Sequence, residues 1–159
     1  MMNQSKKYET LVLIDDDSVY LMLCLRTIER SGKFKKVLSF KYADEALAYI
    51  ENNPEEKIDL IFLDINMPRM SGFEFLNVAT EKLKEQFRAK VVIMLTTSID
   101  VEDIEKSKNF PNIKGYLAKP LTDDRLERSI DLIQNTKIFT ENEIIMIDTD
   151  HATFNQNQS

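Results

Sequence analysis

Short apolar runs recur along the chain, and each is followed by a segment with apolar positions spaced three or four residues apart. The runs cover 11–14, 37–40, 58–63, 91–95 and 113–118. Uninterrupted apolar runs of this length are typical of strands buried on both faces of a sheet. The spacing between them predicts helices at about 18–31, 43–52, 72–88, 101–108 and 123–133. The alternation predicts an α/β fold, a doubly wound five-stranded parallel sheet with helices on both faces.

Polar residues next to these segments predict where the helices begin and end. Asp17 or Ser18, Asp100, and Thr122 or Asp123 are candidate N-caps, and Gly32 is a candidate C-cap. The helix after Asp100 has few large apolar residues, so we expect it to be the least firmly packed. The helix from Gly72 is expected to run on to about Arg88 as a mostly solvated extension.

Side chains able to do chemistry, namely carboxylates, a hydroxyl and an amine, lie at the ends of four of the runs. The run 58–63 ends in Asp64, and the others end in Asp15 and Asp16, in Thr96 and in Lys119. Parallel strands end at one edge of a sheet, and open α/β sheets bind ligands there. Because helix caps are available at other positions, capping alone does not explain these residues. The sequence therefore predicts a site at this edge, centred on Asp64.

The residue types at this edge indicate phosphoryl chemistry. Three carboxylates close together repel one another unless a cation is present. Oxygen ligands suit Mg²⁺, a lysine supplies a point charge for a phosphate, and a threonine supplies a hydroxyl. Such a set favours the transfer of a phosphoryl group to Asp64 by positioning and electrostatics.

Four motifs resemble the receiver domain of bacterial two-component response regulators. They are Val12-Leu13-Ile14-Asp15-Asp16, Leu63-Asp64 through Met67-Pro68 with Met70-Ser71-Gly72, Met94-Leu95-Thr96-Thr97, and Gly115-Tyr116-Leu117-Ala118-Lys119-Pro120. They occur in the family's order and spacing over residues 9–133. The resemblance implies the flavodoxin-like strand order 2-1-3-4-5.

The resemblance also implies roles for the residues of the site. Asp64 is then the phosphoacceptor that forms an aspartyl phosphate. Asp15, Asp16, Asp64 and the backbone carbonyl of Asn66 would hold Mg²⁺, with Mn²⁺ as an alternative. Lys119 would pair with the phosphoryl oxygens, and its peptide bond to Pro120 would be cis.

Further residues would control signalling and the lifetime of the phosphate. The resemblance makes Thr96 and Tyr116 a switch pair that alters the face made by 101–108, 113–118 and 123–133. Asn66 and Ser98 would tune the rate of phosphate loss. The implied partners are a histidine kinase or phosphotransfer protein and an unknown output protein. No activity on a separate substrate is expected.

Composition narrows the classes of function. The chain has 159 residues, a net charge of −6 and one cysteine, Cys24. An acidic chain argues against direct DNA binding and against binding at a membrane surface. No apolar stretch approaches the ~20 residues of a membrane span, so a cytoplasmic location is expected.

The two ends of the chain differ in character from the region between them. Residues 1–8 are expected to be flexible. The tail 134–159 contains the apolar patch Ile144–Ile147, which is interpreted as an extra strand at 143–148 or as a segment that docks on the domain or on a partner. The same patch is a candidate for self-association into a homodimer. The final residues are expected to be disordered, and His151 to be exposed to solvent.

Three other functions are less compatible with these residues. A haloacid-dehalogenase-type phosphatase needs a general acid two positions after the nucleophile, where this chain has Asn66. A flavodoxin-like cofactor binder needs glycines and hydroxyls where this chain has three aspartates. A transcription factor that binds DNA itself would need a basic domain. The expected function is therefore a stand-alone receiver.

Overall fold

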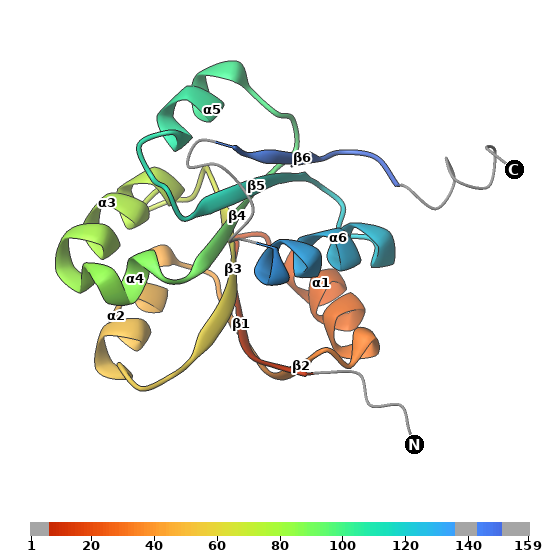
Figure 1. Cartoon of the computed structure of the whole chain (residues 1–159), viewed down its shortest axis with the longest axis horizontal. Helices are drawn as coiled ribbons and strands as arrows, with labels where there is room; N and C mark the ends of the chain where they lie inside the picture. The colour runs from red at the N-terminus through yellow and green to blue at the C-terminus, as the bar shows by residue number, and fades with distance from the viewer. Residues whose placement is uncertain (1–6, 136–142, 151–159) are drawn as a thin grey trace, which may run out of the picture.

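The computed structural model describes residues 7–135 and 143–150, and its centre is a single parallel sheet (Figure 1). The sheet has six strands in the order β2-β1-β3-β4-β5-β6. The strands are β1 (Tyr8–Ile14), β2 (Phe34–Phe40), β3 (Ile58–Asp64), β4 (Val91–Thr96), β5 (Ile113–Ala118) and β6 (Ile145–Ile147). The expected order 2-1-3-4-5 is confirmed, and β6 adds a short strand beside β5.

Helices cover both faces of the sheet, as expected (Figure 1). Helices α1 and α6 lie on one face, and α2, α3, α4 and α5 lie toward the other. Their bounds are α1 (Ser18–Ser31), α2 (Ala43–Asn52), α3 (Gly72–Leu83), α4 (Glu85–Arg88), α5 (Val101–Ser107) and α6 (Asp123–Gln134). None of the helices in the described ranges is long and apolar enough to cross a lipid bilayer.

The central strands are buried on both faces because their side chains feed two separate cores. In β3, Ile61 and Leu63 join the core under α2 and α3, whereas Leu60 and Phe62 join the core under α1 and α6. All four side chains are fully buried. This is why the β3 run shows no alternation in the sequence.

The helix that was expected to run from Gly72 to about Arg88 is broken, so that prediction is wrong. The backbone leaves the helical region at Lys84, whose φ is +51°, and the short helix α4 follows. The break turns Phe87 into the core, where it is fully buried. Its ring meets the ring of Phe75 edge-on, with the ring centroids 5.9 Å apart. Burial of that ring explains why the segment is not a solvated extension.

The helix caps lie at residues that the sequence predicted. The side chains of Asp17, Asp100 and Thr122 accept hydrogen bonds from the first turns of α1, α5 and α6, and Gly32 ends α1 with φ +65°. Strand β2 begins at Phe34, three residues before the expected run, because Phe34 is itself buried. The expectations for residues 1–6, for 151–159 and for His151 lie outside the described residues.

Candidate functional site

The carboxyl edge of the sheet brings together most of the residues that the sequence placed there. A hollow of about 310 Å³ is lined by Asp15, Asp16, Asp17, Asp64, Ile65, Asn66, Thr96, Thr97 and Lys119. One carboxylate oxygen from each of Asp15, Asp16 and Asp64 lies within 4.8 Å of the others. The hollow is therefore polar and acidic, because four aspartates and one lysine line it.

Asp64 is the last residue of β3 and is held by the loop that follows it. The Gly72 N–H donates to the carbonyl of Ile65 at 2.8 Å, which closes the loop onto the strand end. A Cβ at Gly72 would lie 2.5 Å from the backbone oxygen of Asp64. Ser71 caps α3 with a capping box to Glu74, so the helix begins at once. The loop thus fixes the position of Asp64, which is 9% exposed.

The end of β1 supplies the other two acids. Asp15 is fully buried, its N–H donates to the carbonyl of Phe40, and its Oδ1 accepts from the Asp17 N–H at 2.9 Å. Asp16 is half-buried. Asp17 faces solvent and caps α1. The sequence run of three aspartates thus divides into two site residues and one helix cap.

Lys119 reaches the acids from the end of β5. Its Nζ lies 2.6 Å from Oδ2 of Asp15 and 3.5 Å from Oδ1 of Asp64. Its N–H donates to the carbonyl of Thr96 at 2.8 Å, and its peptide bond to Pro120 is cis. The ammonium also sits 4.4 Å above the ring of Tyr20 in α1. Tyr20 was not singled out from the sequence because its spacing marks only the buried face of a helix.

Burial and charge shift the pKa values in the site. Burial, together with the negative charge of Asp15, raises the pKa of Asp64 to about 6 against the opposing effect of Lys119. Burial likewise raises the pKa of Asp15. Burial lowers the pKa of Lys119, but its contacts with the two carboxylates outweigh that effect and raise it overall. The site thus concentrates negative charge that a single lysine does not balance.

The acids fit a hard divalent cation. Oδ2 of Asp15 has no exposed surface and faces the Lys119 ammonium at 2.6 Å. This one ammonium is shared between the carboxylates of Asp15 and Asp64, so the cluster keeps excess negative charge. Three clustered carboxylates with solvent access on one side match the oxygen ligands that Mg²⁺ prefers. The donor set therefore suits Mg²⁺.

The remaining expected residues lie at or beyond the rim. Thr96 lines the hollow, but its hydroxyl donates to the carbonyl of Ser98 at 2.6 Å. Ser98 and the side chain of Asn66 are exposed. Tyr116 is fully buried and does not line the hollow. Its hydroxyl lies 2.5 Å from the hydroxyl of Ser107 in α5, a partner that no sequence signal indicated.

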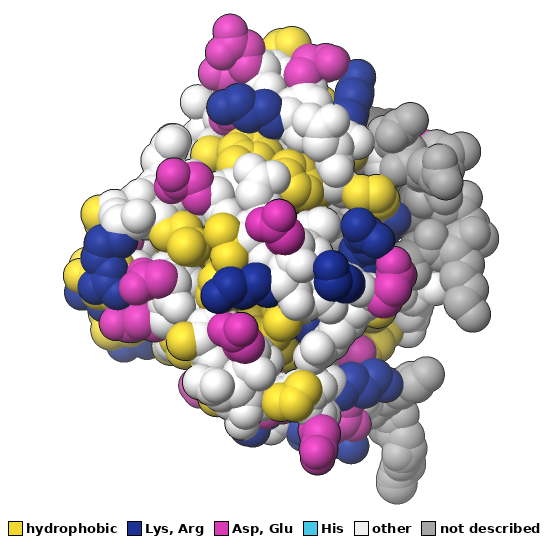
Figure 2. All heavy atoms as spheres, turned by 90° about the vertical axis from the view of Figure 1, so that its left-hand side faces the viewer, with side chains coloured by type: hydrophobic (Ala, Val, Ile, Leu, Met, Phe, Trp, Pro, Cys, Tyr) yellow, Lys and Arg dark blue, Asp and Glu magenta, His cyan; other side chains and the backbone are white. Residues whose placement is uncertain are grey.

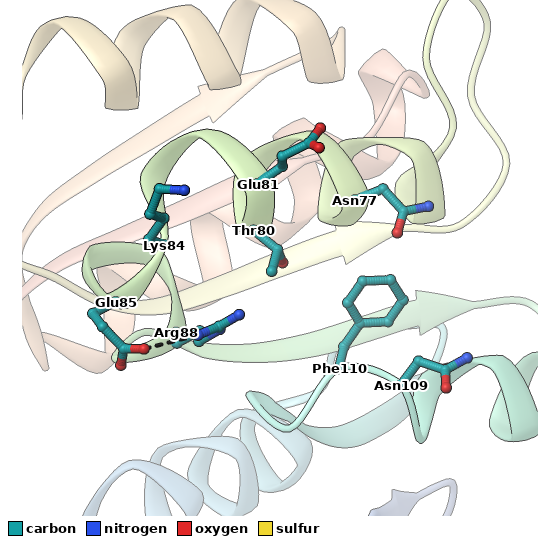
Figure 3. A pocket seen from close by; sticks show the side chains of 8 residues that line it. All are labelled: Asn77, Thr80, Glu81, Lys84, Glu85, Arg88, Asn109 and Phe110. Atoms are coloured by element: carbon teal, nitrogen blue, oxygen red, sulfur yellow. Dashed lines mark hydrogen bonds and ion pairs between the residues drawn. The ribbon is translucent and has the colours of Figure 1, made fainter.

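A second hollow, of about 770 Å³, lies away from the acids (Figure 3). Figure 3 shows it between α3 and α4 on one side and Asn109 and Phe110 on the other. Its charged side chains have both signs, and Arg88 is already paired with Glu85 at 2.8 Å. Size alone does not make it the candidate site, because it lacks a convergent set of titratable groups.

Comparison with known proteins identifies the family to which the sequence is similar. Residues 11–131 match the family model described as the response regulator receiver domain. The chain is 28% identical to the probable methanogenesis regulatory protein FilR2 of Methanothrix harundinacea over 78% of this chain and 80% of that protein. It spans only 23–57% of the length of several transcriptional regulators that it also matches.

Solved structures agree with the fold. A two-component response regulator from Cytophaga hutchinsonii matches with a TM-score of 0.76 and 23% identity, over 82% of this chain and 99% of that chain. The chemotaxis protein CheY4 of Vibrio cholerae matches with a TM-score of 0.68 and 25% identity, over 79% of this chain and 98% of that chain. Both similarities support the α/β fold described above.

Proposed function

The chain belongs to the response regulator receiver domain family, and from that premise we propose that Asp64 is its phosphoacceptor. The observation that carries the proposal is the position of Asp64, which ends the central strand β3 in an acidic hollow beside Lys119. An oxygen of the Asp64 carboxylate attacks the phosphorus of the donor. A P–O bond to Asp64 forms as the bond to the donor breaks, and the leaving group takes up a proton.

The surrounding residues prepare Asp64 for this step. Asp15, Asp16, Asp64 and the backbone carbonyl of Asn66 would hold Mg²⁺, or Mn²⁺ in its place. The ion, when bound, supplies positive charge that offsets repulsion between the acids and an incoming phosphate. Lys119 then turns its ammonium from Asp15 to the phosphoryl oxygens.

The donor is proposed to be a histidine kinase or a phosphotransfer protein. Three exposed apolar side chains of α1, Val19, Met22 and Leu23, support docking of a protein beside the site. Asp17, which lines the hollow, caps the same helix, so a protein seated on α1 would overlie the mouth of the hollow. Exposed large apolar groups that cluster are typical of interaction surfaces.

Signalling is proposed to use the switch pair Thr96 and Tyr116. When Asp64 is phosphorylated, the Thr96 hydroxyl leaves Ser98 and donates to the phosphoryl group. Because β5 carries Tyr116 and pairs with β4, this movement changes the surface formed by α5, β5 and α6, where an output protein would bind. Asn66, which lines the hollow, and Ser98, which is exposed two residues after Thr96, would influence how fast water removes the phosphate.

The organisation that we propose is a receiver over residues 9–133 with a tail over 134–159, acting as a stand-alone regulator. Its only catalysis would be its own phosphorylation and dephosphorylation. The net charge of −6 does not favour direct DNA binding. Figure 2 supports this, because the face with α2 and α3 carries charges of both signs interspersed, with no extended basic area.

Intact mass spectrometry tests the proposal. The protein is incubated with acetyl phosphate and Mg²⁺, and a single phosphate adduct is expected on the wild type. Asp64→Asn should give none. Asp59→Asn is the matched control, because Asp59 lies at the opposite end of the same strand and should leave the adduct unchanged. An adduct on Asp64→Asn, or none on the wild type, would overturn the assignment. Size exclusion of the same samples reports whether phosphorylation drives dimer formation.

A further inference from the structure

The outer edge of β5 is occupied by the chain's own segment 144–150. Strand β6 runs parallel to β5, and Gly115, Tyr116 and Leu117 are paired with Ile145, Met146 and Ile147. The segment places side chains on both faces of the sheet. Ile144 and Met146 pack toward the core that contains Tyr116, whereas Ile145 and the fully buried Ile147 pack toward the core under α6.

Two arginines of α6 hold this segment along β6 and beyond its end. The Arg125 Nε donates to Oδ1 of Asp150 at 3.1 Å, and its Nη2 donates to the carbonyl of Asp148 at 3.2 Å. Arg128 donates to the carbonyls of Met146 and Thr149. The hydroxyl of Thr122 also donates to Asp150, at 2.9 Å. The binding groups are thus an open strand edge and two guanidinium groups aimed at carbonyl and carboxylate oxygens.

The β5 edge is shaped for a closely approaching backbone. At Gly115 a Cβ would lie 3.0 Å from the carbonyl oxygen of Ile145 and 3.0 Å from Cδ1 of Leu132. Main-chain pairing with pockets for alternate side chains is the general mode by which a sheet edge recognises an extended peptide. Arg125 also donates to the carbonyls of Ala118 and Pro120, which flank Lys119.

We propose that the β5 edge with Arg125 and Arg128 is a strand-binding surface whose resident occupant is residues 144–150 of the same chain. A protein that binds at this face must displace this segment and carry an extended stretch of like chemistry. That stretch has apolar residues at alternate positions and a carboxylate three positions after the last of them, as Ile147 and Asp150 do. The proposal does not depend on phosphorylation of Asp64.

A labelled peptide of residues 143–150 tests the proposal by fluorescence anisotropy on the 159-residue protein. Ile147→Asp should release the resident segment because Ile147 is fully buried. In the wild type the tethered resident segment competes with the peptide at an effective concentration of order mM. The peptide should therefore bind the variant at least about tenfold more tightly than the wild type. Equal affinity for both proteins, or no binding to a folded Ile147→Asp, would overturn the proposal.

Second-site variants separate recognition from folding. Arg128→Ala added to Ile147→Asp should weaken the peptide several-fold, whereas Arg26→Ala, an exposed arginine on α1, should not. If Ile147→Asp does not fold, Arg128→Ala in the otherwise unchanged chain should speed amide exchange at Ile145–Ile147 several-fold. Unchanged exchange there would contradict the proposal. A wild-type dimer that dissociates in Ile147→Asp would assign the occupant to a second copy and overturn its assignment to the same chain.

Discussion

The ammonium of Lys119 lies 2.6 Å from Asp15 but 3.5 Å from Asp64, so the lysine is paired chiefly with the acid that is not the proposed phosphoacceptor. A lysine in this position lowers the repulsion within the acid cluster while Asp64 keeps a free oxygen. The arrangement leaves the cation poised to move from one carboxylate to a phosphoryl group attached to the other.

Replacing this lysine should separate metal binding from phosphorylation. In Lys119→Gln the acids lose their nearest positive charge, so the affinity for Mg²⁺ should rise, by about tenfold. Formation of the adduct with acetyl phosphate should fall by at least about tenfold because the phosphoryl oxygens lose a partner. Calorimetric titration and intact mass measure the two effects. Weaker Mg²⁺ binding in the variant would contradict the electrostatic account.

The raised pKa of Asp64 predicts an unusual pH dependence for the metal-free protein. The pKa is about 6 in the folded chain against 3.8 ordinarily, so the folded state holds this proton more tightly than the unfolded state. The stabilisation is complete below pH 3.8 and is lost as the pH rises through 6, a change of about 2–3 kcal/mol. Urea unfolding in EDTA at a series of pH values measures this change in unfolding free energy.

Two comparisons isolate the contribution of Asp64 to this pH dependence. Asp64→Asn should be more stable than the wild type at pH 8 in EDTA and should lose the dependence near pH 6. Asp59→Asn should retain it. Saturating Mg²⁺ should restore the stability of the wild type at pH 8, because the cation compensates the carboxylate charge. A wild type that gains stability from pH 5 to pH 8 in EDTA would contradict the prediction.

The sequence predicted strands β1 to β5 and the edge of the sheet that carries the acids, because both depend on local patterns. Apolar runs mark strands buried on both faces, and the residues that end them are placed by topology alone. The break at Lys84 was missed because a residue such as Lys carries no signal for positive φ. The contact of Tyr20 with Lys119 and that of Tyr116 with Ser107 depend on packing between elements, which no spacing encodes.

Gly72 should tolerate no side chain, because a Cβ would meet three backbone atoms of Asp64 and Ile65 at 2.5–3.3 Å. Gly72→Ala should cost about 2–3 kcal/mol of unfolding free energy and should reduce formation of the adduct, because it displaces the strand end. Gly32→Ala is the control. Its Cβ meets nothing within 4 Å, so only the cost of φ +65° remains, about 1 kcal/mol, with no loss of adduct. Equal adduct losses would refute the steric explanation.

The short helix α4 should contribute to the core through one ring. Phe87 is fully buried against Phe75, so Phe87→Ala should lower the unfolding free energy by about 3–5 kcal/mol. Arg88→Ala, at the exposed neighbouring position, should change it by less than about 0.5 kcal/mol. Urea unfolding of both variants distinguishes a core element from a solvated extension, for which the two costs would be similar.

The hydroxyl of Tyr116 should anchor α5, a helix in which no apolar side chain is fully buried. It lies 2.5 Å from the Ser107 hydroxyl and donates to the carbonyl of Asp103 at 2.9 Å, while Val101 is 74% exposed. Tyr116→Phe removes these bonds and keeps the ring, so α5 should lose about 1 kcal/mol of local stability, seen as roughly fivefold faster amide exchange in Val101–Ser107. Ser107→Ala removes the bond to Tyr116 and the bond that Ser107 itself donates to the carbonyl of Asp103, so it should speed exchange to a similar extent. Because β5 carries Tyr116, a change in that strand reaches α5 through these bonds. Exchange in α2 should stay unchanged in both variants, and a uniform increase over the whole chain would instead indicate global destabilisation.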